Sequence, residues 1–114
     1  MVRTGPTAVE QRRQAALARR LDEAGFVLPG SLITRHMRCG KINCHCHDEP
    51  AELHGPYLQW TRTADGKTLT RLLPDEVADR YREWFDNARR LRETITALET
   101  LSTTIVERDR QAHR

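Results

Sequence analysis

The chain is poor in the features that large apolar structures need. Only 5% of its 114 residues are aromatic, 31% are charged, and no apolar run approaches the roughly 20 residues of a membrane-spanning helix. The N-terminal stretch has a basic residue but no apolar segment of a secretion signal behind it. These absences favour a small domain in the cytoplasm whose modest core needs the support of a metal or a partner.

Cysteine is scarce, and its distribution is uneven. The chain has three cysteines, and all of them lie between positions 39 and 46 in the stretch RCGKINCHCH. An odd number of thiols cannot pair completely within one chain, and a reducing cytoplasm disfavours disulfides. The stretch therefore indicates either a metal site or reactive thiols.

Three thiolates and one imidazole form the donor set of a closed, tetrahedral structural zinc site. Gly40 permits a tight turn after the first cysteine, and Lys41 adds positive charge beside a site that would be net negative. In an extended segment, the second and third cysteines point to one side and the neighbouring histidines point to the other. The predicted zinc ligands are Cys39, Cys44, Cys46 and His54, and His36, His45 and His47 are the alternatives for the imidazole.

Motifs of catalysis are missing as well. The chain has no glycine-rich phosphate loop and no G-x-S-x-G sequence. Residues 47–49 spell the H-x-E of zinc deaminases, but every cysteine precedes them and no C-x-x-C exists. A closed ligand set leaves no position for a reactive water. We therefore expect a binding protein rather than an enzyme.

Lysine is rare among the basic residues, because 17 of the 19 are arginine. Residues 1–47 hold eight basic and three acidic side chains, whereas residues 75–114 are balanced, with eight against nine. Arginine suits bidentate contact with phosphate, so we predict a nucleic-acid surface, for DNA rather than RNA, with a merely solvated basic face as the alternative. The predicted phosphate contacts are Arg12, Arg13, Arg19, Arg20, Arg35, Arg38, Lys41, Arg62 and Arg71.

Hydrophobic patterns predict an α+β fold with an N-terminal helix, a small zinc-pinned three-stranded antiparallel β unit and a long C-terminal helix. Residues 6–24 carry apolar side chains at helical spacings, and residues 31–38 alternate as in a strand. Two further strands, 57–63 and 67–73, flank the type I′ turn signal Asp65-Gly66. This hairpin pairs Trp60 with Arg71. Trp60 is expected to pack under arginine side chains, with base stacking as the alternative.

The longest pattern follows Pro74, which with two acidic residues after it suits the start of a helix. Apolar residues then repeat at steps of four and three, which predicts a coiled-coil-like helix over residues 75–110. A small domain cannot cover this stripe alone, so we expect a homodimer or another helix partner, with an intramolecular helical hairpin as the alternative. The predicted seam is Val77, Tyr81, Trp84, Ala88, Leu91, Ile95, Leu98 and Ile105.

The residues around the cysteines resemble those of a known family. The order is R-C-G-K-x-x-C-x-C, H-G-P-Y, an aromatic strand, D-G-K, a second strand ending in L-P, and a long charged helix. Together they resemble small bacterial and archaeal proteins that carry an uncharacterised domain and are frequently encoded beside transposase or recombinase genes. The resemblance covers residues 30–91, without the N-terminal helix, and implies a mobile-element neighbourhood and a metal site.

The sequence thus divides into residues 1–29, 30–74 and 75–110 within one compact domain. We predict a zinc-binding, dimeric accessory protein of a mobile element that binds nucleic acid. One alternative is an adaptor that docks a transposase or recombinase through its C-terminal helix. The other is a thiol or zinc redox sensor, in which oxidation of the cysteines releases the metal.

Overall fold

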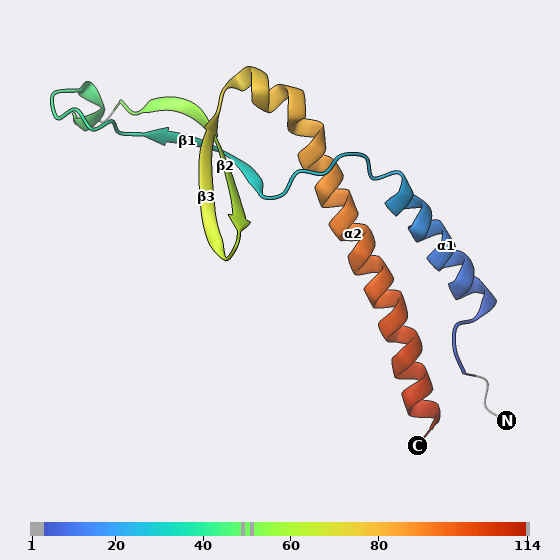
Figure 1. Cartoon of the computed structure of the whole chain (residues 1–114). Coiled ribbons are helices and arrows are strands. Elements are labelled where there is room, and N and C mark those ends of the chain that lie inside the picture. The colour runs from blue at the N-terminus through green and yellow to red at the C-terminus, as the bar shows by residue number, and fades with distance from the viewer. Residues whose placement is uncertain (1–3, 49, 51, 114) are drawn as a thin grey trace. The chain divides into compact units, whose positions relative to one another are not determined.

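The computed structural model has an α+β architecture and describes residues 4–48, 50 and 52–113. In chain order the elements are α1 (Ala8–Asp22), β1 (Ser31–Met37), the 3₁₀ helix η1 (His45–His47), β2 (His54–Ala64), β3 (Lys67–Leu73) and α2 (Asp75–Ala112), as Figure 1 shows. The predicted N-terminal helix, three-stranded antiparallel sheet and long C-terminal helix are confirmed. The chain forms two compact units: the first unit combines residues 1–27 with residues 86–114, and the second unit consists of residues 28–85.

Helix α1 begins with a capping box. The Thr7 hydroxyl accepts a hydrogen bond from the Glu10 backbone N–H at 3.1 Å, and the Glu10 carboxylate accepts one from the Thr7 N–H at 2.8 Å. These bonds satisfy N–H groups that have no partner within the first helical turn. Beyond the last turn, Gly25 adopts a φ of 70°, which only glycine adopts at little cost. The predicted helix of residues 6–24 is therefore shorter by two residues at each end.

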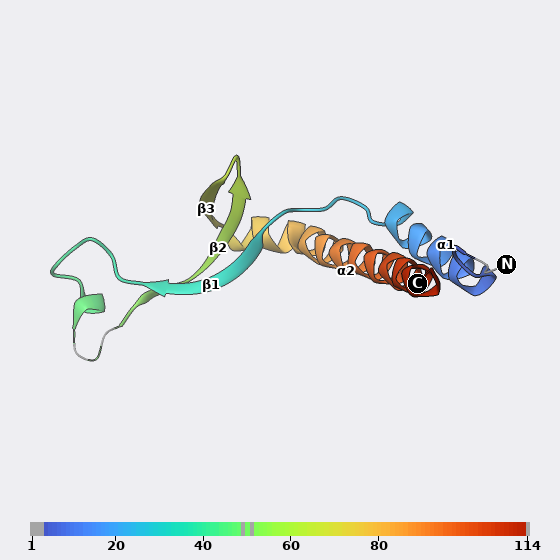
Figure 2. The same ribbon diagram turned by 90° about the horizontal axis from the view of Figure 1, so that it is seen from below.

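Within the first unit, α1 lies along the C-terminal part of α2, as Figures 1 and 2 both show. Leu17 of α1 is fully buried. At one end of the pair, the buried Asn87 side chain donates to the Phe26 carbonyl at 2.9 Å. At the other end, the Arg108 guanidinium donates to both carboxylate oxygens of Glu10 at 2.9 Å. Polar bonds at both ends thus join α1 to α2, and the apolar Leu17 between them is shielded from solvent.

The sheet of the second unit has the strand order β1-β2-β3 with antiparallel neighbours, so β1 and β3 are its edges. Ala64 pairs with Lys67 and Trp60 with Arg71, which confirms the predicted hairpin register. Asp65 and Gly66 have φ values of 52° and 76°, as a two-residue turn with both central residues at positive φ requires.

The more apolar face of the hairpin forms the core of the second unit. Trp60 contacts Phe85 of α2 edge to face, with ring centroids 6.4 Å apart, and its indole N–H donates to the Pro29 carbonyl at 2.8 Å. The Arg62 guanidinium lies 4.3 Å from the centre of the Trp60 ring. Trp60 is therefore packed under an arginine, as predicted. The Arg62 guanidinium covers one face of its ring.

The predicted seam of α2 lies on the covered side of the helix for most of its length. Ala88 is buried, and the members other than Ile95 are half-buried. Ile95 is 44% exposed, whereas the neighbouring Thr94 is 5% exposed and its hydroxyl donates to the Arg90 carbonyl at 2.9 Å. The buried line therefore passes through Thr94 rather than Ile95. Among the described residues, no helix combines the length and apolarity needed to cross a bilayer.

Candidate metal centre

The loop between β1 and β2 brings the three cysteines to the start of β2. The ladder between these strands ends with Met37 paired with His54, so residues 38–53 leave and re-enter the sheet at one place. Next to this pair, Gly55 adopts a φ of 135°, and a Cβ there would lie 2.9 Å from the Arg35 carbonyl. A side chain at position 55 would push the strands apart, so glycine is needed directly after His54.

The conformation around the second and third cysteines differs from the expected extended segment. Residues His45–His47 form η1, and the His47 and Asp48 N–H groups donate to the carbonyls of Cys44 and His45 at 3.1 and 3.0 Å. The prediction of an extended segment at this point was therefore wrong. The 3₁₀ turn satisfies backbone groups locally in a loop that has no ladder partner.

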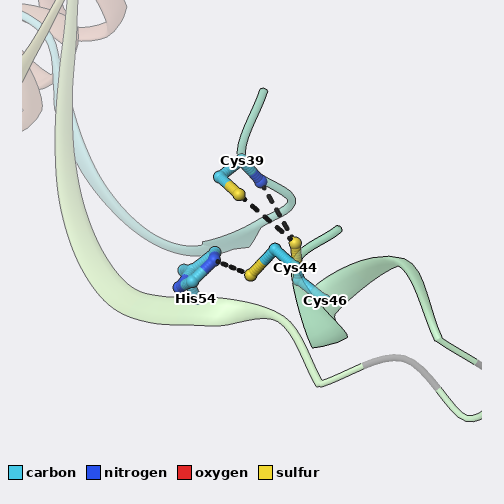
Figure 3. A group of neighbouring side chains, drawn as sticks. All are labelled: Cys39, Cys44, Cys46 and His54. Carbon is cyan, nitrogen blue, oxygen red and sulfur yellow. Dashed lines mark hydrogen bonds between the residues drawn. The ribbon is translucent and has the colours of Figure 1, made fainter. Parts of the chain in front are cut away.

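The four predicted ligands nevertheless converge. Their donor atoms, the Sγ atoms of Cys39, Cys44 and Cys46 and a ring nitrogen of His54, all lie within 4.8 Å of one another. The Sγ atoms of Cys39 and Cys46 are 3.7 Å apart, and Cys44 Sγ is 3.1 Å from His54 Nε2. Figure 3 shows the Cys39 and Cys46 sulfurs facing each other and the Cys44 sulfur facing the imidazole of His54, which lies at the start of β2. Cys46 is fully buried, and the other three are half-buried.

These distances fit a tetrahedral metal site better than a disulfide. A bonded pair of sulfurs lies about 2.05 Å apart, so all three cysteines are free. With metal–sulfur bonds of about 2.3 Å and tetrahedral angles, neighbouring sulfurs lie about 3.8 Å apart, close to the Cys39–Cys46 distance. The Cys44–His54 contact needs to lengthen by only about half an ångström for the same geometry.

The surroundings of the Cys39 and Cys46 thiols shift their pKa values in opposite directions. Hydrogen bonding with the Lys41 backbone lowers the pKa of the Cys39 thiol. Burial raises the pKa of the Cys46 thiol, although the Cys39 N–H points at its sulfur from 3.3 Å. A divalent cation would hold both groups as thiolates, because a coordinated thiol loses its proton.

The other histidines lie outside the cluster. His47 Nε2 is 2.9 Å from the Cys39 carbonyl oxygen, so this imidazole supports the backbone of a candidate ligand. His45 Nε2 is 3.9 Å from a carboxylate oxygen of Glu52. Among the described residues, the group that can hold a metal contains His54 and none of the alternatives that the sequence left open.

The predicted phosphate contacts are distributed over both units. Arg62 lies over Trp60, and Arg71 donates to the Thr70 carbonyl at 2.9 Å. The remaining seven are exposed, and within the described part of the chain they form no ion pair or side-chain hydrogen bond: Arg12, Arg13, Arg19, Arg20, Arg35, Arg38 and Lys41. Several arginines of α2 do have acidic partners: Arg82 with Asp79, Arg89 with Asp86, Arg108 with Glu10 and Arg110 with Glu107.

Sequence reasoning did not identify the bonds between Arg108 and Glu10 or between Asn87 and Phe26. Both join residues far apart in the chain, and neither has a local signal. The S/T-x-x-E pattern at Thr7 and Glu10 could have indicated the start of α1.

Fold and site together define a small α+β protein with a candidate three-cysteine, one-histidine metal centre. A family model described as a domain of unknown function (DUF6788) matches residues 7–83, about two thirds of the chain. The chain therefore belongs to this family. The match includes α1, which the resemblance noted in the sequence did not. Comparison with curated proteins and with solved structures gives no match.

Proposed function

We propose that the protein binds one Zn²⁺ through Cys39, Cys44, Cys46 and His54, and that the metal has a structural role. The observation that carries this proposal is the convergence of three thiols and one imidazole within 4.8 Å. Soft thiolates favour zinc over the hard cations that bind oxygen ligands. Four protein ligands complete a tetrahedron, which supports a binding function rather than hydrolytic chemistry.

The bound metal would stabilise the second unit. It would join the end of β1, the loop and the first residue of β2, so part of its binding free energy becomes folding free energy. Both tryptophans, Trp60 and Trp84, belong to this unit. Zinc removal by a chelator should therefore change the tryptophan emission, whereas most of the helical circular dichroism should persist. Unchanged emission would refute the structural role.

We further propose that the exposed basic side chains before η1 contact the phosphates of a nucleic acid, with DNA as the first candidate; these are Arg12, Arg13, Arg19, Arg20, Arg35, Arg38 and Lys41. The supporting observation is the contrast between the two ends of the chain. Four of the seven arginines of α2, Arg82, Arg89, Arg108 and Arg110, have carboxylate partners, whereas among the described residues the arginines of α1 and of the loop between β1 and β2 have none. Unpaired guanidinium groups are free to replace the counterions of a phosphate backbone.

A salt titration of DNA binding tests this proposal. The logarithm of the affinity should fall linearly with that of the salt concentration, with a slope of about −0.9 per phosphate contacted in a duplex. Replacing Arg12 and Arg13 together by alanine should weaken binding and make the slope shallower by roughly 1 to 2. The matched double variant, Arg82→Ala with Arg110→Ala, removes paired arginines and should leave the slope unchanged. Absence of binding at low salt would refute the proposal.

A role beside a transposase or recombinase, and a helix partner or dimer, remain proposals drawn from the sequence. Ile95 and Val106 of α2 are 44% and 63% exposed, which leaves apolar side chains for a partner helix. If the adaptor alternative is right, capture of the partner should survive loss of the arginines on α1. If the sensor alternative is right, mild peroxide should release zinc rapidly, although complete burial of Cys46 slows such a reaction.

A further inference from the structure

A shallow hollow of about 460 Å³, widely open to solvent, lies beside the candidate metal centre. Its walls come from the end of β1 and from the last part of the loop before β2. The lining residues are Arg35, His36, Met37, Arg38 and Leu53. Because Met37 pairs with His54 in the ladder, the end of β1 lies next to Leu53, the residue just before β2.

The hollow combines apolar surface with unpaired positive charge. Leu53 is 43% exposed, and Met37 is half-buried beside it. Arg35 and Arg38 are exposed and have no acidic partner among the described residues. Among the described residues that line the hollow, none is a carboxylate. A nucleotide has the complementary chemistry, because its base offers an apolar face and its phosphate accepts bidentate bonds from arginine.

We infer that this hollow binds an unpaired nucleotide of a single-stranded nucleic acid. The base lies against Leu53 and Met37, and the phosphate is held by Arg35 and Arg38. This inference rests on the nucleic-acid function proposed above and adds the part of the ligand that is recognised. Unpaired bases expose their faces, whereas a duplex presents only base edges in its grooves.

The candidate metal ligands position both parts of the hollow. Arg38 directly precedes Cys39, and Leu53 directly precedes His54. Coordination of these two ligands by one metal fixes the cationic side relative to the apolar side. We therefore expect zinc to be required for base recognition, whereas general attraction to phosphates depends on charge alone.

The test uses the zinc-loaded full chain and two labelled strands of equal length, an oligothymidylate and an abasic strand with the same phosphates. The parent protein should bind the oligothymidylate about tenfold more tightly, which corresponds to ~1.4 kcal/mol. Leu53→Ala should abolish this preference, whereas Leu53→Met should retain it. The matched control is Leu72→Ala on β3, since Leu72 is 51% exposed and lies outside the hollow.

The arginines should behave differently from Leu53. Arg35→Ala or Arg38→Ala should weaken binding of both strands alike and reduce the salt slope by about 0.7 for a single strand. The preference for the strand with bases should persist in both variants. Such a separation of affinity from base preference is the pattern expected when different side chains contact phosphate and base.

The outcomes distinguish this inference from the function on which it rests. If the parent protein binds neither strand at low salt, the nucleic-acid function itself is wrong. Equal affinity of the parent protein for both strands would refute nucleotide binding in the hollow but not the nucleic-acid function. An equal loss of preference in Leu53→Ala and Leu72→Ala would have the same meaning. If Leu53→Ala loses zinc, nuclear magnetic resonance of the leucine methyl groups in the parent protein tests the inference instead. Those of Leu53 should shift on addition of oligothymidylate and those of Leu72 should not, and the absence of a Leu53 shift would overturn the inference.

Discussion

Replacing Leu17 by alanine would show how strongly α1 is held against α2. Leu17 is fully buried, so the substitution removes three carbon groups from the helix interface and leaves a cavity. At ~0.8 kcal/mol per group, the lost transfer free energy is about 2.4 kcal/mol, and a partly collapsed cavity raises the cost to about 3 kcal/mol. Small domains have a free energy of unfolding of about 5–15 kcal/mol, so this is a large fraction.

Urea denaturation followed by helical circular dichroism measures the effect. With a slope of roughly 1–1.5 kcal/mol/M for a chain of this size, the unfolding midpoint should fall by about 2–3 M. The control Leu72→Ala removes the same groups from a side chain that is 51% exposed and should cost less than about 1 kcal/mol. A cost below about 0.5 kcal/mol for Leu17→Ala would refute the packing of α1 described here.

Three further predictions concern an ion pair, a hydrogen bond and a turn glycine. Bonding to Arg108 lowers the pKa of Glu10 from 4.5 to about 2, so this stabilisation is complete above pH 4.5 and is lost as the pH falls toward 2. Glu10→Gln should therefore unfold with a weaker pH dependence in that window, and identical acid titrations of the two proteins would contradict this. Asn87→Ala leaves the Phe26 carbonyl without its bond and should lower the free energy of unfolding by about 1–2 kcal/mol, whereas an unchanged urea midpoint would show that water replaces the amide. Gly66→Ala should cost about 1 kcal/mol through its positive φ alone, because no atom lies within 4 Å of the added carbon, and a stabilised variant would exclude the turn described here.

The parts of the fold that could be predicted from sequence are those set by local chemistry. Asp65 and Gly66 select a two-residue turn, and the turn then fixes every pair of the hairpin. Pro74 and the acidic residues after it mark the start of α2. In each case the determining interactions lie within a few residues of one another.

The candidate metal centre was predictable in its chemistry but less so in its conformation. The spacing of the cysteines and His54 predicted the donor set, and the structure brings these atoms together. The 3₁₀ turn at His45–His47 was not predictable from alternation, because the ends of the loop are fixed by the β1–β2 ladder rather than by the loop's own sequence.

The contacts between α1 and α2, in contrast, could not be predicted from the sequence. Side-chain type alone favoured Ile95 over Thr94 for the buried line, but Thr94 satisfies its hydroxyl within the helix and occupies the covered side. The ion pair of Arg108 with Glu10 joins residues 98 positions apart. Only the paired helices bring these residues into contact, so no pattern within either helix predicts them.

The most direct test of the zinc centre is the metal content of protein purified without added metal. We predict about one zinc per chain in the parent, and loss of that zinc in Cys46→Ser and in His54→Ala. The matched control His45→Ala should retain zinc, because His45 lies outside the four-residue cluster. A parent protein without zinc, or a His54→Ala protein that keeps all of it while His45→Ala loses it, would contradict the proposed centre.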